Sequence, residues 1–211
     1  QKKAFETNSS IRFVQDSTYP FWIDDLPFPF NSGFQLQNVK TALLAIDGLS
    51  KKEEISIDQK LFVRALENIS KNTGYQKRIE IVHENPRVIL DVSHNLEGIK
   101  ATLFLLQNTF KGNLFIIYGS SSDKNYHEII ESFPGNSKVC LTPFHSERSW
   151  TFQALSEIKK ENSEREIELF NDVNLAISSC IQRSSAEDTI LVFGSFFLIQ
   201  DITLDFKNPG I

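Results

Sequence analysis

The stretch RVILDVSHNLEGIKATLFLLQNTF, residues 87–110, decides the fold of this chain. Residues 88–90 form an unbroken apolar run of the length that is typical of a strand buried on both faces. Asp91 ends that run, and a polar turn at residues 92–95 leads into apolar side chains spaced three and four residues apart, which predict an amphipathic helix. Asn95 is the natural N-cap of that helix. The stretch therefore predicts half of a parallel βαβ unit.

The remainder of the chain repeats this alternation of strand and helix. Strands are predicted at residues 113–118, 138–141, 166–170 and 189–193, and helices at residues 152–160 and 171–182. Such an alternation favours a parallel sheet with right-handed crossovers, so the predicted fold class is α/β, a Rossmann-like, doubly wound and mostly parallel sheet. Ligands bind such sheets beyond the carboxyl ends of the strands. The polar turn at residues 91–95 is therefore the first candidate site.

The residues before the central stretch have a different pattern. Residues 11–14 and 21–23 predict short strands, and residues 39–46 predict an amphipathic helix. Residues 56–59 (Ser-Ile-Asp-Gln) have the pattern of a capping box that opens another helix.

A boundary between two parts is predicted near residues 84–86, after a strand with alternating polarity at residues 78–82. This gives one part at residues 1–84 and a second at residues 85–211. The apolar helix faces of the first part would be left uncovered without the rest of their domain, which favours dimerisation through that surface.

The composition is that of an ordinary globular protein, with 40% hydrophobic and 23% charged residues and a net charge of −5. A negative net charge does not favour nucleic-acid binding, and no apolar run is long enough to cross a membrane. Cys140 and Cys180 lie in strand and helix patterns, which favours buried thiols in a reducing compartment over a disulfide or a metal pair. We therefore expect a cytoplasmic protein with neither nucleic acid nor membrane as a partner. The start at Gln1 and the lack of methionine indicate a fragment of a longer chain.

The turn after the central strand has the pattern D-x-x-H-N, carried by Asp91, His94 and Asn95. This pattern resembles a motif of the folylpolyglutamate synthase/dihydrofolate synthase family, within the Mur ligase superfamily. The resemblance extends in matching order over residues 30–205, and its carboxyl-terminal portion supplies most of the matches. These are Gly119 to Lys124 for G-x-x-x-D-K, Thr142 to Arg148 for T-x-x-x-x-x-R, and Val192 to Phe196 for V-x-G-S-x.

The first part resembles the end of the family's central ATP-binding domain. Gln35, Asn38 and Ala42 carry the pattern Q-x-x-N-x-x-x-A, shortly after Gly33, where that domain opens a helix. Arg78 matches an arginine on the strand that leads out of the domain. The glycine that usually precedes this arginine is replaced here by Lys77. The resemblance thus implies a fragment of the ATP-binding domain followed by a complete carboxyl-terminal domain.

The resemblance also implies a ligase that forms a C–N bond. Such enzymes use ATP to convert a carboxylate to an acyl phosphate, which the amine of L-glutamate attacks; here the acceptor would be tetrahydrofolate. The implied cofactors are ATP and Mg²⁺, with most of the metal site in an amino-terminal part, and the implied ligands are ATP, glutamate and folate. The implied site residues are Asn38 for adenine, Arg78 for ATP phosphates, Asp91 for ribose, His94 for catalysis, and Ser195 and Lys124 for glutamate.

Each of these residues except His94 also has a purely structural interpretation. They are a helix cap for Asn38, a salt bridge for Arg78, turn caps for Asp91 and Asn95, a surface charge for Lys124 and a capping hydroxyl for Ser195. The other three histidines, His83, His127 and His145, have no metal-ligand spacing.

Neither the phosphate loop G-x-x-x-x-G-K-[ST] nor the dinucleotide pattern G-x-G-x-x-G occurs in the chain. We therefore expect that the chain by itself does not catalyse ligation and holds one wall of an active site. Two other hypotheses remain: a Mur-type cell-wall amino-acid ligase, and a non-catalytic Rossmann-type nucleotide-binding or interaction module. The segments at residues 35–38 and 194–196 favour the folate enzymes over the cell-wall ligases.

Overall fold

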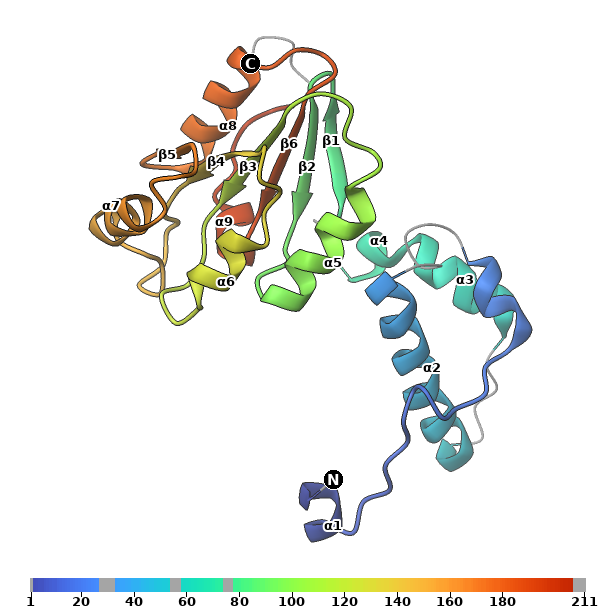
Figure 1. Cartoon of the computed structure of the whole chain (residues 1–211). Coiled ribbons are helices and arrows are strands. Elements are labelled where there is room, and N and C mark those ends of the chain that lie inside the picture. The colour runs from blue at the N-terminus through green and yellow to red at the C-terminus, as the bar shows by residue number, and fades with distance from the viewer. Residues whose placement is uncertain (1, 27–32, 54–57, 74–77, 207–211) are drawn as a thin grey trace. The chain divides into compact units, whose positions relative to one another are not determined.

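The computed structural model describes residues 2–26, 33–53, 58–73 and 78–206 of the chain. The chain divides into two compact units, Gln1–Tyr75 and Gln76–Ile211. The first unit is helical and the second contains the sheet (Figure 1).

The first unit contains four α-helices and one 3₁₀ helix among its described residues. They are α1 (Lys2–Glu6), the 3₁₀ helix η1 (Phe21–Asp25), α2 (Gly33–Glu53), α3 (Gln59–Glu67) and α4 (Ile69–Thr73). Helix η1 inserts Trp22 and Ile23 into a small apolar core, where Val39 and Leu43 of α2 also lie. The predicted helix at residues 39–46 is confirmed and is longer than predicted.

The two short strands predicted in the first unit do not form. Residues 21–23 form a turn of 3₁₀ helix and residues 11–14 are not a strand, because a run of three or four apolar residues fits either kind of element. Helix α3 is capped by Asp58, whose side chain accepts a hydrogen bond from the backbone N–H of Lys60 at 2.9 Å. Ser56, the predicted cap, lies outside the described residues.

The second unit is a six-stranded sheet with helices on both faces (Figure 1). The strands are β1 (Glu80–Glu84), β2 (Arg87–Asp91), β3 (Leu114–Tyr118), β4 (Lys138–Leu141), β5 (Ile167–Leu169) and β6 (Thr189–Phe193), in the order β1-β2-β6-β3-β4-β5. The four pairings from β2 to β5 are parallel and only β1 is antiparallel. The predicted α/β fold with a mostly parallel sheet is confirmed.

The helices of this unit are α5 (Leu96–Leu106), α6 (Tyr126–Glu131), α7 (Phe152–Glu161), α8 (Val173–Arg183) and α9 (Phe196–Gln200). Helices α5, α6 and α7 cover one face of the sheet, and α8 and α9 cover the other (Figure 1). Along β3, Ile116 packs on the first face and Ile117 on the second, so the strand is buried on both sides. The sequence does not predict α6, a six-residue helix whose only buried residues are Ile129 and Ile130.

The compact unit begins earlier than the predicted boundary near residues 84–86, because β1 pairs with β2 and belongs to the sheet. The assignment of residues 1–84 to part of an ATP-binding domain stays a prediction.

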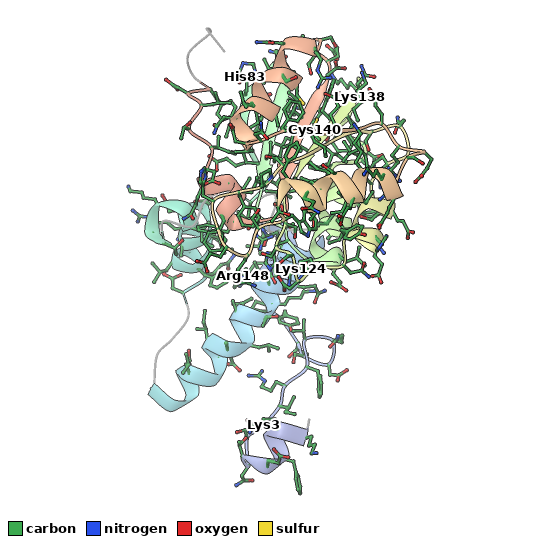
Figure 2. The ribbon with its side chains drawn as sticks, turned by 90° about the vertical axis from the view of Figure 1, so that its left-hand side faces the viewer. Lys3, His83, Lys124, Lys138, Cys140 and Arg148 are labelled. Atoms are coloured by element: carbon green, nitrogen blue, oxygen red, sulfur yellow. The ribbon has the colours of Figure 1, made fainter. Side chains whose placement is uncertain are left out.

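The cysteines are free and buried, as predicted, with their sulfur atoms 3.6 Å apart between β4 and α8; Figure 2 labels Cys140. Among the described residues, no helix combines the length and apolar character needed to span a bilayer.

Asp188 hydrogen-bonds to residues at the amino ends of β2 and β3, beside the start of β6. Its carboxylate accepts hydrogen bonds from the backbone N–H groups of Asn113 at 2.7 Å and Ser185 at 2.8 Å, and the residue is 3% exposed. Its carbonyl oxygen accepts a hydrogen bond from the N–H of Arg87 at 3.0 Å. Burial alone would raise the pKa of Asp188, but the hydrogen bonds from Ser185 and Asn113 outweigh it and the pKa lies below its ordinary value.

We therefore predict that Asp188 makes the stability of the second unit depend on acid pH. A carboxyl with a lowered pKa in the folded state stabilises the fold above its unfolded pKa of about 4, and this contribution is lost as pH falls through the folded pKa. Asp188→Asn should cost about 1–3 kcal/mol at pH 7 and much less near pH 2–3. Urea unfolding of both proteins between pH 7 and 2.5 checks this, with Glu187→Gln, the exposed neighbouring carboxyl, as control. A cost for Asp188→Asn that is equal at all pH values would refute the prediction.

Candidate active site

The carboxyl ends of three adjacent strands meet at one edge of the sheet. Phe193, the last residue of β6, is paired with Asp91 at the end of β2 and with Tyr118 at the end of β3. The turns that follow these strands, together with the loop after β4, therefore lie along one edge. We call this the carboxyl edge and define it as residues 91–95, 119–124, 142–149 and 194–195.

Two glycines let the turns after β3 and β6 touch. Gly194 has a φ of +124°, and a Cβ atom built on it would lie 2.3 Å from the carbonyl oxygen of Gly119 and 2.6 Å from the ring of Tyr118. Gly119 itself would place a Cβ atom 2.5 Å from the carbonyl oxygen of Thr142. Only glycine fits such close backbone approaches. The G-x-x-x-D-K and V-x-G-S-x segments are thus brought into direct contact.

Asp91 is completely buried and its carboxylate is occupied by donors of this chain. One oxygen accepts hydrogen bonds from the N–H of Ser93 at 2.8 Å and the hydroxyl of Thr102 at 3.3 Å, and the other accepts the N–H of Ile79 at 3.0 Å. Asp91 thus shapes the turn, as its structural interpretation predicts. A contact with ribose stays a prediction.

Arg78 lies just before β1, and its guanidinium donates a hydrogen bond to the hydroxyl of Ser93 at 3.1 Å. The structure therefore brings Arg78 to the same turn as Asp91 and His94. The next residue, Ile79, has a φ of +51°, which is an outlier for a β-branched side chain. The hydrogen bond between the Ile79 N–H and Asp91 helps to hold this backbone conformation.

His94 is exposed at the carboxyl edge, directly before the N-cap Asn95. Its Nδ1 atom lies 3.1 Å from the carbonyl oxygen of Val92. Because a carbonyl oxygen only accepts, Nδ1 carries the proton and Nε2 of the neutral ring keeps its lone pair. His94 thus offers a base or hydrogen-bond acceptor, which is the arrangement that a catalytic role needs.

A small basic cluster joins the loops after β3 and β4. The Asp123 carboxylate lies 3.3 Å from the Lys124 ammonium and 3.6 Å from the Arg148 guanidinium. Figure 2 shows Lys124 and Arg148 next to each other, and the N–H of Ser122 donates to the Arg148 carbonyl at 2.8 Å. The hydrogen bond from Lys124, assisted by the charge of Arg148, holds the pKa of Asp123 below its ordinary value. With two cations and one carboxylate, the cluster is net positive and suits a carboxylate ligand.

Ser195 opens α9, where its hydroxyl accepts a hydrogen bond from the N–H of Phe197 at 3.2 Å. This is the structural role considered from the sequence, and a role at a glutamate ligand stays a prediction. Asn38 lies inside α2, so the alternative role as a helix cap is wrong. Its amide donates to the Gln35 side chain at 3.2 Å and it is exposed, and its contact with adenine stays a prediction.

The sequence interpretation missed Thr102 and Ile79, which donate hydrogen bonds to Asp91, and it assigned no role to Asp123 within the G-x-x-x-D-K segment. Thr102 had a visible signal, because a threonine at this position falls on the apolar face of α5 beside Ile99 and Leu103 and is 1% exposed. Buried hydroxyls require hydrogen-bond partners, so a polar partner across the helix was predictable. No sequence signal indicates the left-handed conformation of Ile79.

The described residues contain no group of three His, Cys, Asp or Glu side chains arranged to hold a metal ion.

A mostly parallel sheet with its polar turns gathered at one edge defines a domain of the Rossmann-like α/β class. Within that class, the chain belongs to the family "Mur ligase, glutamate ligase domain", whose model matches residues 77–196, more than half of the chain. The predicted membership of the Mur ligase superfamily is thus confirmed.

The most similar curated proteins include two named dihydrofolate synthase/folylpolyglutamate synthase. The protein of Buchnera aphidicola subsp. Baizongia pistaciae is 27% identical over 178 residues, which cover 82% of this chain and 38% of that protein. The protein of Bacillus subtilis is 24% identical over 170 residues, again 38% of its length. This chain therefore spans less than two-fifths of these relatives.

Solved structures agree on the fold. The bifunctional folylpolyglutamate synthase/dihydrofolate synthase of Yersinia pestis, complexed with AMPPNP and a manganese ion, matches with a TM-score of 0.65 at 21% identity, covering 82% of this chain and 39% of that one. The folylpolyglutamate synthase of Thermotoga maritima matches with a TM-score of 0.57 at 26% identity, covering 80% and 37%. The predicted resemblance to this group of enzymes is confirmed.

Proposed function

We propose that this chain forms the carboxyl-terminal part of an ATP-dependent amide ligase that adds L-glutamate to tetrahydrofolate. The observation that carries the proposal is the carboxyl edge, where the turns that contain His94, Lys124 and Ser195 follow the ends of three adjacent strands of a glutamate ligase domain. The relatives named dihydrofolate synthase/folylpolyglutamate synthase support folate as the acceptor. One structural neighbour holds manganese, AMPPNP and L-glutamate together.

The proposed reaction has two chemical steps. Transfer of the terminal phosphoryl group of ATP to the substrate carboxylate gives an acyl phosphate and ADP, and attack by the glutamate amine then releases phosphate. We assign Arg78 to phosphate recognition, because a guanidinium is always charged and binds phosphate oxygens through two N–H groups. His94 is assigned to the reaction centre and Asn38 to adenine.

The glutamate ligand is assigned to the basic cluster and to Ser195. Lys124 and Arg148 supply positive charge for its carboxylates, while Asp123 holds both cations in place. Charge-assisted hydrogen bonds of this kind are stronger than neutral ones.

The chain lacks a phosphate-loop motif, so we propose that it does not ligate by itself and binds ATP weakly. Calorimetric titration with ATP tests this and is expected to give weak or undetectable binding. Sub-micromolar affinity would contradict a divided site and would favour the independent nucleotide-binding module.

The amino-acid substrate is tested separately by ¹⁵N NMR spectra of the chain with L-glutamate, D-glutamate or L-alanine. L-Glutamate is expected to shift the amide signals of Gly119, Ser122 and Ser195, and Arg148→Gln should abolish these shifts. Lys138→Gln, which removes a lysine at the opposite end of β4, is the matched control and should leave them unchanged. A response to D-glutamate or L-alanine alone would favour a cell-wall ligase.

A further inference from the structure

The turn after β2 contains a closed set of hydrogen bonds that links Arg78 to Asp91. The Arg78 guanidinium bonds the Ser93 hydroxyl at 3.1 Å, the Ser93 and Thr102 hydroxyls are 3.2 Å apart, and the Thr102 hydroxyl bonds Asp91 at 3.3 Å. Asp91, Ser93 and Thr102 are 0%, 2% and 1% exposed. The bonds between Ser93, Thr102 and Asp91 are therefore shielded from solvent, while Arg78 approaches them from a partly buried position.

The direction of these hydrogen bonds is fixed by chemistry. A guanidinium only donates, so Ser93 accepts from Arg78, and an ionised carboxylate only accepts, so Thr102 donates to Asp91. Each hydroxyl has one proton, which leaves Ser93 as the donor to Thr102. The chain of donors thus runs from Arg78 through Ser93 and Thr102 to Asp91, and bonds aligned in this way strengthen one another.

This arrangement holds a cation where a helix repels it. Ser93 lies two residues before Asn95, the N-cap of α5, and the amino end of a helix carries a partial positive charge. The relay connects the guanidinium to the negative charge of Asp91 at this position. Asp91 also accepts a hydrogen bond from the N–H of Ile79, so the same carboxylate holds the backbone directly after Arg78.

We infer that Thr102 and Asp91 are positioning residues that aim Arg78 at the turn before α5, where it meets a phosphate-bearing ligand. The inference deepens the proposed function and rests on it only for the nature of the ligand. Thr102 itself does not touch the ligand, because its side chain is buried beneath the turn.

The test follows the side-chain Nε–H signal of Arg78 in ¹H–¹⁵N NMR spectra of the full chain. Thr102→Val removes the hydroxyl while keeping the shape, and is expected to shift this signal from its wild-type position. Thr102→Ser keeps the hydroxyl and should restore the wild-type position. Thr109→Val is the matched control, since the Thr109 hydroxyl bonds the Leu106 carbonyl at the other end of α5. An unchanged Arg78 signal in folded Thr102→Val would overturn the inference.

Ser93→Ala provides an independent test, because it cuts the same relay one step earlier and decides the matter if Thr102→Val does not fold. Displacement of the Arg78 signal supports the inference, and an unchanged signal overturns it.

Titration with ATP then separates the positioning role from the proposed function. The Arg78 signal of the wild type should respond to millimolar ATP, and Thr102→Val should weaken the response about fivefold, as expected for the loss of one net hydrogen bond. If the variants displace Arg78 but the wild type ignores ATP, the positioning role stands and the assignment of Arg78 to phosphate fails.

Discussion

Gly194→Ala is expected to destabilise the second unit by about 3 kcal/mol or more. The φ of +124° at this position disfavours every residue except glycine. The new Cβ atom would also lie 2.3 Å from the Gly119 carbonyl oxygen, and backbone atoms cannot move aside as a flexible side chain does. Relief of the overlap must separate the turns after β3 and β6.

Urea unfolding of Gly194→Ala measures this effect. Gly135→Ala is the matched control, because a Cβ atom there meets nothing within 4 Å, and its stability should stay within about 0.5 kcal/mol of wild type. The variant should also lose the NMR response to L-glutamate at Ser195, since this residue directly follows the displaced backbone. Wild-type stability of Gly194→Ala would show that the two turns are not in contact.

Asp91→Ala is expected to cost about 3 kcal/mol or more of folding stability, since it leaves two buried donors and one partly buried donor without an acceptor. These are the N–H groups of Ile79 and Ser93 and the hydroxyl of Thr102. A residue that served only a ribose hydroxyl would instead lower nucleotide affinity and leave stability unchanged. Denaturant unfolding therefore distinguishes the two roles of Asp91.

The matched control for Asp91→Ala is Asn95→Ala in the same turn. The Asn95 side chain serves one donor, the N–H of Gly98 at 2.9 Å, so its loss should cost about 1 kcal/mol, as for other helix caps. Equal costs for the two variants would contradict the network around Asp91.

Much of the fold was predictable from the sequence because local patterns report burial. The strands β4 and β6 have the predicted bounds, and Asn95 caps α5 as expected. Where a segment is short, the pattern fails. Residues 21–23 gave a 3₁₀ helix in place of a strand, and α6 has too few buried residues to show a period. For the site, the polar turn at residues 91–95 was predictable, whereas the partners of each side chain were not.

By itself, the sequence determined that this chain contains an alternating α/β domain whose polar turns follow buried strands, because the periods of apolar residues depend only on local geometry. Only the tertiary structure decided that β6 lies between β2 and β3, which puts the turns at Asp91, Gly119 and Gly194 along one edge. It also decided that Asp91 accepts hydrogen bonds from the N–H of Ile79 and the hydroxyl of Thr102. Pairings between residues distant in sequence follow from strand order and close packing, which no local pattern encodes.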